Sequence, residues 1–211
     1  MAEVRSTDET PLPVFPLGSV LFPGAVLPLR VFEPRYLHLM EDVVGDRRRF
    51  GVVLIERGWE VGGGDERFAV GTEAHVVGMG PSGEGDLTVL AVGVDRFRVV
   101  QWMPDDPYPA ATVTEIHDED GEPEPADLER CSILLRRIYA LASELGAEVG
   151  TIPEPSSDPQ AAMWELCASA PIGQLDRQRL LESVKVAERL ERLTAMLEEE
   201  AAVIEARLAG G

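Results

Sequence analysis

The sequence predicts an α+β protein, in which a small barrel or folded sheet is followed by a helical bundle. From the start of the chain to about residue 118, apolar residues follow the period of strands, and Gly and Pro mark the turns. After the acidic, proline-bearing segment 118–125, the apolar period changes from 2 to about 3.6. We therefore expect a β-rich subdomain over residues 1–118 and an α-helical subdomain over residues 119–211.

The segment LPVFPLGSVLFPGAVLPLRVFEPRY, residues 12–36, is strongly apolar and contains five prolines. Because proline cannot donate to a sheet ladder, it is confined to sheet edges, strand starts and bulges. The segment is therefore predicted to form two short strands with a bend at Pro23 and Gly24, an order that favours a type II turn. We expect these strands to wrap around and close the barrel.

One short helix follows Pro34, which suits a first helical turn, and Tyr36, Leu37, Met40 and Val44 lie at helical spacing. Further strands are then expected. They lie at residues 49–58, 68–80, 87–102 and 108–118, and the segment PSGEGD between the second and third suits a hairpin.

The C-terminal part predicts three helices. An amphipathic helix runs to Gly146, which stands where a C-cap is expected, and a second begins with Asp158 as N-cap and stops before Pro171. The remaining apolar stripe predicts one helix of more than 30 residues over 175–209. That stripe could pair with a second chain, although its lack of strict heptads favours packing within this chain. The oligomeric state is left open.

The composition argues against several classes of partner. The formal net charge is −19, from 38 acidic and 19 basic residues, which opposes binding to nucleic acid and to anionic membranes. The chain has no apolar run long enough to span a membrane and no leader-like N-terminus, so a cytoplasmic protein is expected. Cys131 and Cys167 form no CxxC pair and are expected to be small buried hydrophobic residues.

Signals for catalysis, cofactors or metals are weak. The sequence has a single lysine, Lys185, and no GxxxxGK[ST] motif, so no P-loop is expected. GMGPSG at residues 78–83 is followed by a strand, whereas a dinucleotide-binding loop must open a helix. His38, His75 and His117 fall in three different elements without metal-ligand spacing. We therefore expect neither a cofactor nor a metal.

The motifs together carry a family resemblance. LPVFPLGSVLFPGAVLPLRVFEPRYLHLM, FGVVLI, VGTEAHVV and VGVDRFRV occur in the order and spacing that resemble the N-terminal substrate-recognition domain of ATP-dependent Lon proteases. The resemblance is strongest to stand-alone bacterial proteins that consist of this domain alone, and the helical part resembles the same family. It implies a PUA-like pseudo-barrel followed by a helical bundle. The ATPase and Ser-Lys protease modules of full-length members have no counterpart here, so we expect a protein that is not an enzyme.

The leading functional hypothesis is a module that binds unfolded or apolar peptide segments of other proteins, with a protease or chaperone as a further candidate partner. A cleft beside the edges of short strands that are interrupted by proline could hold an extended peptide. The candidate binding residues are Leu21, Phe22, Met79 and Arg96. Phe22 would be available to a partner if the bend is exposed, and a position in the core is an equally open alternative.

A second hypothesis is a small-molecule sensor or a cryptic hydrolase. Glu33, Glu73 and Asp95 are the carboxylates of the motif segments, and two of them facing each other in a compact cleft could perform acid–base chemistry. Glu33 also has a structural explanation, since a carboxylate at the start of the short helix favours the helix dipole.

Overall fold

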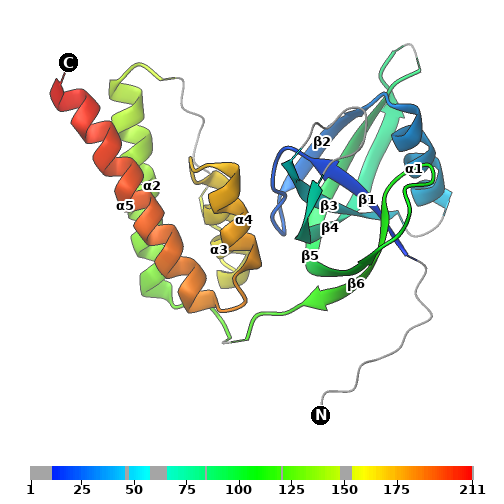
Figure 1. The fold of residues 1–211 in the computed structure, drawn as a ribbon. Helices are drawn as coiled ribbons and strands as arrows, with labels where there is room; N and C mark the ends of the chain where they lie inside the picture. The colour runs from blue at the N-terminus through cyan, green and yellow to red at the C-terminus, as the bar shows by residue number, and fades with distance from the viewer. Residues whose placement is uncertain are drawn as a thin grey trace. The chain divides into compact units, whose positions relative to one another are not determined.

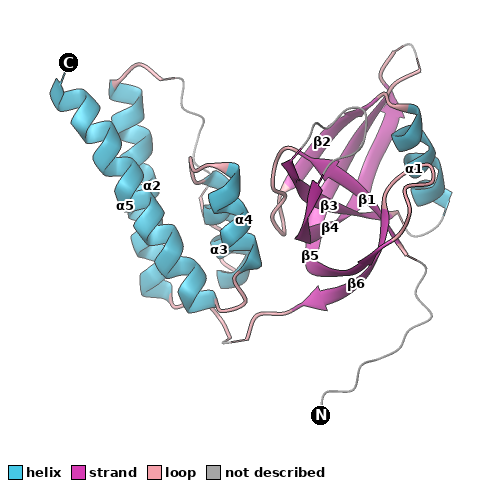
Figure 2. Cartoon of the chain, viewed as in Figure 1, coloured by secondary structure: helices cyan, strands magenta, loops and turns pink. Residues whose placement is uncertain are grey.

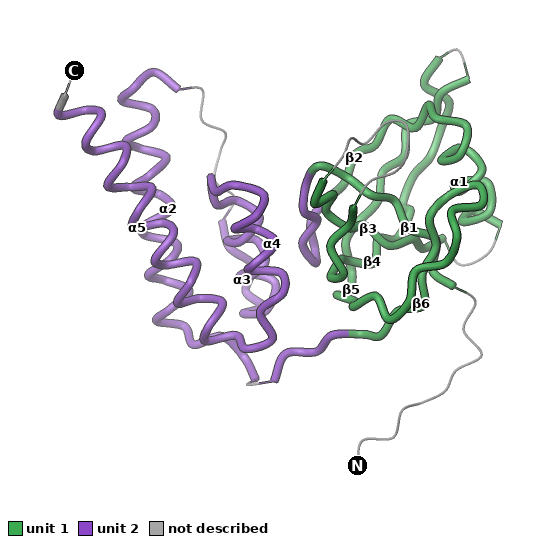
Figure 3. Tube along the Cα trace, in the orientation of Figure 1, with its two compact units in different colours: residues 1–18, 27–115 green, residues 19–26, 116–211 purple. Residues whose placement is uncertain are grey.

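The structure is a computed structural model that describes residues 11–45, 48–57, 66–83, 85–119, 121–147 and 154–210. The chain divides into two compact units (Figure 3). The first, which we call the barrel unit, comprises Met1–Gly18 and Leu27–Glu115. The second, the helical unit, comprises Ser19–Val26 and Ile116–Gly211, so it includes a short segment from the N-terminal part of the sequence.

The barrel unit is built on a mixed sheet of six strands and one helix, α1 (Figures 1 and 2). The strand order is β2-β5-β4-β3-β1-β6, and an additional pairing of β5 with β6 closes the sheet into a ring. The elements are β1 (Leu12–Leu17), β2 (Val26–Val31), α1 (Pro34–Gly45), β3 (Arg49–Arg57), β4 (Glu66–Pro81), β5 (Leu87–Trp102) and β6 (Ala110–Ile116). The predicted α+β fold class is confirmed.

The two proline-rich strands, β1 and β2, have different partners in the sheet. β1 pairs in parallel with β3 and, over two residues, antiparallel with β6, whereas β2 lies beside β5. β1 therefore connects β3 to β6 within the ring. The predicted hairpin is also present, because β4 and β5 pair antiparallel along nearly their whole length.

The barrel core is packed so closely that it requires glycine at one sheet position. Gly71 of β4 pairs with Val53 of β3, and a Cβ atom at Gly71 would lie 2.2 Å from the backbone oxygen of Val52 and 2.8 Å from Cζ of Phe97. Phe97 is buried in the same cluster as Leu12.

α1 begins where Pro34 predicts, but its buried face is turned relative to the prediction. Tyr36 and Met40 are buried as expected, while the other two buried residues are Leu39 and Val43 rather than Leu37 and Val44. Phe15 of β1 stacks on Tyr36 with ring centroids 4.1 Å apart. The reason for the difference is that several apolar residues lie close together in α1, so spacing alone does not decide which of them face the sheet.

The helical unit contains, in its described residues, α2 (Pro125–Glu144), α3 (Pro159–Ser169), α4 (Gln174–Glu182) and α5 (Val186–Gly210). Gly146 follows α2 with a φ of 79°, as a C-cap glycine does. The side chain of Asp158 accepts hydrogen bonds from the backbone N–H groups of Gln160 and Ala161, so the predicted N-cap of α3 is confirmed. α3 ends before Pro171.

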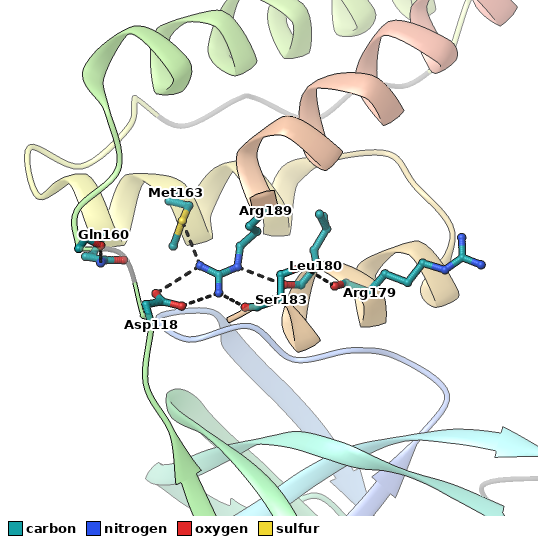
Figure 4. Close-up of polar contacts among 8 residues, drawn as sticks. Asp118, Gln160, Met163, Arg179, Leu180, Ser183 and Arg189 are labelled. Carbon is teal, nitrogen blue, oxygen red and sulfur yellow. Dashed lines mark hydrogen bonds and ion pairs between the residues drawn. The ribbon is translucent and has the colours of Figure 1, made fainter. Parts of the chain in front are cut away.

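The long helix predicted over 175–209 is wrong, because the chain is broken at residues 183–185, between α4 and α5 (Figure 4). The guanidinium of the fully buried Arg189 donates to the backbone oxygens of Leu180 and Ser183, which are freed where α4 ends. It also pairs with Asp118, with Nη2 2.6 Å from Oδ1. The break is therefore stabilised by a long-range ion pair that helical periodicity does not reveal.

α5 packs its apolar stripe within the helical unit. α2 and α5 run side by side (Figure 1), and Arg130 and Arg137 of α2 pair with Glu198 and Glu205 of α5. The stripe is buried in this chain; its buried members are Leu190, Leu193, Leu197, Ala201 and Ile204. In the described part of the chain, no helix is both long and apolar enough to cross a membrane.

Candidate functional site

The bend at Pro23 and Gly24 is a type II turn that belongs to the helical unit. The N–H group of Ala25 donates to the oxygen of Phe22 at 3.1 Å, and Gly24 has a φ of 78°. The side chain of Phe22 is only 1% exposed and stacks on Trp164 of α3, with ring centroids 5.8 Å apart. Of the two alternatives that the sequence left equally open for Phe22, the structure shows the core position, although Gly24 in the same bend is exposed.

Arg177 of α4 contacts both the Phe22 ring and the C-terminal end of α3. Its guanidinium carbon lies 5.3 Å from the centroid of the Phe22 ring, and its two terminal nitrogens donate to the backbone oxygens of Ala168 and Ala170, where α3 ends. The N–H group of Val20 also donates to Oε1 of Gln174 at 2.9 Å. The turn is thus anchored in the helical unit by aromatic, cationic and backbone contacts.

The four candidate binding residues are divided between the two units. Leu21 and Phe22 are buried in the helical unit, whereas Met79 and Arg96 lie in the barrel unit. Arg96 is buried as well, so Met79 of β4, at 42% exposed, is the one of the four whose side chain is open to solvent. That any of them binds a peptide stays a prediction.

The outer face of the β4–β5 hairpin carries apolar side chains where a solvated sheet face usually carries polar ones. Along β5, Val89, Ala91 and Gly93 are buried, and Leu90 and Val94, which alternate with them, are 42% and 38% exposed. Since side chains alternate across a strand, Leu90, Val92 and Val94 share the outer face. The sequence signal was the unbroken apolar run VLAVGV, which is apolar at both alternating sets of positions.

Val77 of β4 extends this surface. A register shift between the pairs Val76↔Ala91 and Gly78↔Leu90 places two residues of β4 opposite one residue of β5, which is a β-bulge. Val77 lies at this bulge and is 57% exposed, so its side chain points outward beside Leu90. We call the surface formed by Val77, Leu90, Val92 and Val94 the hairpin face.

Two of the three carboxylates considered for hydrolysis line one small cavity. Glu73 and Asp95 surround a cavity of about 180 Å³ together with Arg49 and Arg96. Oε2 of Glu73 accepts a hydrogen bond from Arg49 at 3.2 Å, and its Oε1 lies 2.9 Å from Nε2 of His75. Both carboxylate oxygens of Glu73 are therefore engaged by neighbouring side chains.

Glu33 is not part of this cavity. It pairs with Arg35, with Oε2 3.1 Å from Nε, and its backbone oxygen accepts from the N–H groups of Tyr36 and Leu37 in the first turn of α1. These contacts place Glu33 at the start of α1, and its effect on the helix dipole stays a prediction.

A larger cavity, of about 510 Å³, lies in the barrel unit and was not predicted from the sequence. Its lining comes from the start of β1, from α1, from Arg49 and from residues 103–110. The hydroxyl of Tyr108 donates to Oδ2 of Asp42 at 2.5 Å. Burial, this hydrogen bond and the negative charge of Asp42 raise the pKa of Tyr108 to about 12, so the phenol stays protonated at neutral pH.

The groups that could hold a metal or act as a nucleophile are dispersed. In the residues that the structure describes, no group of three or more His, Cys, Asp and Glu side chains could hold a metal ion. Both cysteines are buried, and Sγ of Cys131 lies 3.2 Å from the hydroxyl of Thr194. Burial raises the pKa of the Cys131 thiol, which disfavours the reactive thiolate.

Known proteins with a similar sequence share this fold, and they identify a family that matches the chain. A family model described as the ATP-dependent protease La (LON) substrate-binding domain matches residues 11–199. The crystal structure of a Lon N-terminal domain protein from Xanthomonas campestris is similar, with a TM-score of 0.67 and 32% identity, over 89% of this chain and 98% of that one. The N-terminal domain of a Mycobacterium avium complex Lon protease shares the fold, with a TM-score of 0.60 and 17% identity over 90% of this chain and 98% of that one.

Full-length proteases are also similar to this chain. Lon protease 2 of Myxococcus xanthus is 31% identical over 192 residues, which cover 88% of this chain and 23% of that protease. The Lon protease of Anaeromyxobacter dehalogenans is 30% identical over 192 residues, which also cover 88% of this chain and 23% of that protease. The chain thus spans about a quarter of the length of these relatives.

Proposed function

The chain belongs to the LON substrate-binding domain family, and from this premise we propose that it is a non-enzymatic module that binds apolar segments of other proteins on its hairpin face. The observation that carries the proposal is the set of apolar side chains on the outer face of β4 and β5. Leu90, Val94 and Val77 are exposed on these two paired strands, and Val77 and Val94 lie at their two register shifts.

The energetic argument follows from the exposed apolar surface. Removing such surface from water stabilises a complex by roughly 25 cal/mol per Å². The hairpin face belongs to paired strands, so its backbone is already ordered and little backbone entropy is lost when a partner covers it. A rigid apolar surface of this kind suits an extended or unfolded segment that contributes its own apolar side chains.

The net charge of the chain indicates which peptide segments it should bind. With a net charge of −19, the protein repels acidic segments at long range and favours basic or neutral ones. A protease that receives the bound segment is the kind of partner that the names of the relatives suggest, and a chaperone is a further candidate for this chain.

The alternative of a small-molecule sensor or hydrolase that uses the motif carboxylates Glu73 and Asp95 has weaker support. The cavity that holds Glu73 and Asp95 has a volume of about 180 Å³, below the roughly 300 Å³ at which ligand sites usually begin. Glu73 is also held by Arg49 and His75, which opposes a role as a mobile acid or base.

An array of extended peptides tests the proposal. The purified protein should capture apolar, uncharged or basic peptides. The variant Leu90→Gln should lower this capture about tenfold, because it replaces an apolar side chain of the hairpin face with an amide. Met79→Gln tests the remaining exposed candidate from the sequence. Val100→Gln is the matched control, since Val100 is an exposed valine of β5 outside the hairpin face.

The outcomes separate clearly. Equal capture by the wild-type protein and the Leu90→Gln variant would place the site elsewhere. Absence of capture of any peptide by the wild-type protein would contradict peptide binding itself. A loss that Val100→Gln shares would indicate a general effect on the sheet rather than a binding surface.

A further inference from the structure

The cavity of about 510 Å³ in the barrel unit has the size of a small-molecule site, since ligand pockets usually measure about 300–1,000 Å³. It shares no residue with the hairpin face, so an inference about it goes beyond the proposed function. Its lining has an apolar part and a charged part, and the two together indicate what it can hold.

The apolar part is formed by buried and conformationally restricted residues. Leu12 of β1 and Val43 of α1 are buried, and Pro11, Pro13 and Pro104 add rigid rings to the wall. These side chains are fixed before a ligand arrives, so a short aliphatic chain could be covered with little cost in conformational entropy.

The charged part carries two carboxylates, Asp42 and Asp106. Tyr108 donates its hydroxyl to one oxygen of Asp42, and a carboxylate can accept further hydrogen bonds at its remaining lone pairs. Arg49 also lines the cavity, but its Nη1 donates to Glu73, so its charge is compensated from outside this cavity. The charge that the cavity presents to a ligand is therefore negative.

We infer that this cavity binds an organic cation, namely a primary ammonium or guanidinium group carried on an apolar stem. The cationic end would pair with Asp42 and Asp106, and the stem would lie on Leu12 and Val43. An anionic ligand would meet like charges, and a neutral alkyl ligand would desolvate the carboxylates without giving them a partner. The same chemistry occurs in free alkylamines and in the lysine and arginine side chains of peptides.

Three six-carbon probes of equal chain length test the charge requirement. Binding of hexylamine, hexanol and hexanoate to the full chain is measured by isothermal titration calorimetry and by amide chemical shifts in ¹⁵N-labelled protein. We expect hexylamine to bind at least about tenfold more tightly than hexanol, and hexanoate to bind most weakly. Equal binding of hexylamine and hexanol, or no binding of hexylamine at millimolar concentration, would overturn the inference.

Two variants locate the site. Asp42→Asn and Asp106→Asn should each weaken hexylamine binding about tenfold. Glu41→Gln is the matched control, because Glu41 is an exposed carboxylate next to Asp42 on α1 that does not line the cavity. If Asp42→Asn disturbs the fold through Tyr108, the exposed Asp106 still carries the test. Unchanged affinity in Asp106→Asn and in a folded Asp42→Asn would refute the site.

A peptide pair identifies the source of the cation. Acetyl-Leu-Arg-Leu-amide is compared with the same peptide containing citrulline, which has nearly the shape of arginine without its charge. Stronger binding of the arginine peptide, with displacement of hexylamine, would assign the cavity to basic side chains of peptides. Binding of hexylamine alone would assign it to free amines. Because the hairpin-face variant Leu90→Gln leaves this cavity intact, failure of one proposal does not decide the other.

Discussion

Replacing Phe22 with alanine should destabilise the helical unit rather than only remove a binding contact. The ring is almost fully buried, stacks on Trp164 and lies beneath the guanidinium of Arg177. Phe22→Ala therefore removes a large side chain from a packed core and leaves a cavity between α3, α4 and the turn. The same substitution at an exposed bend would have left the fold intact.

The magnitude follows from the size and burial of the ring. Truncation of a buried phenylalanine to alanine costs about 3–5 kcal/mol of unfolding free energy. The aromatic pair with Trp164 accounts for about 0.5–1.5 kcal/mol of this cost beyond the buried area, and the contact with Arg177 is included in the same loss. We expect a total loss of about 3–5 kcal/mol for the helical unit.

Urea denaturation followed by circular dichroism at 222 nm measures this loss, since four of the five described helices lie in the helical unit. Phe32→Ala makes the same chemical change at a half-exposed position of the barrel unit, and it should alter the unfolding free energy by no more than about 0.5 kcal/mol. A loss below about 1 kcal/mol for Phe22→Ala, together with weaker peptide capture, would refute the core assignment and restore Phe22 as a binding residue.

Three further predictions concern other buried contacts. Arg189→Ala should cost about 3–5 kcal/mol in the same urea experiment, because it leaves Asp118 and two backbone oxygens of the α4–α5 break without their donor; a cost under about 1 kcal/mol would contradict this assignment. Gly71→Ala should lower the thermal midpoint of the barrel unit, because its Cβ atom would lie 2.2 Å from the backbone oxygen of Val52. An unchanged midpoint would show that β3 and β4 can move apart at this position without a cost in stability. The stability that wild type gains over Tyr108→Phe should be present below pH 10 and shrink as the pH rises toward 12, because the phenol loses its proton more readily in the unfolded chain; a gap that is constant from pH 9 to 11 would contradict the raised pKa.

The sequence by itself determined most of the local structure. The chemistry of single residues predicted three features, and all are present: the type II turn at Pro23 and Gly24, the N-cap at Asp158 and the C-cap glycine after α2. These features depend on the φ preference or the hydrogen-bonding group of one or two residues, so they can be predicted without knowledge of distant neighbours. The motifs also predicted the family and the α+β fold.

The tertiary structure decided which residues are covered and which are exposed. The local sequence of the turn does not decide whether the Phe22 side chain is exposed or buried. The side chain is buried by α3 and α4, which lie more than 130 positions later in the sequence. The long C-terminal stripe reads as one helix, yet Arg189 and Asp118 stabilise a break in it through an ion pair that spans 71 positions. The hairpin face depends on a bulge at Val77, and the 510 Å³ cavity gathers residues from both ends of the barrel unit's sequence. Periodicity describes how side chains repeat along an element, whereas burial, register and cavities depend on partners that are distant in the sequence, and only the folded chain brings those partners together.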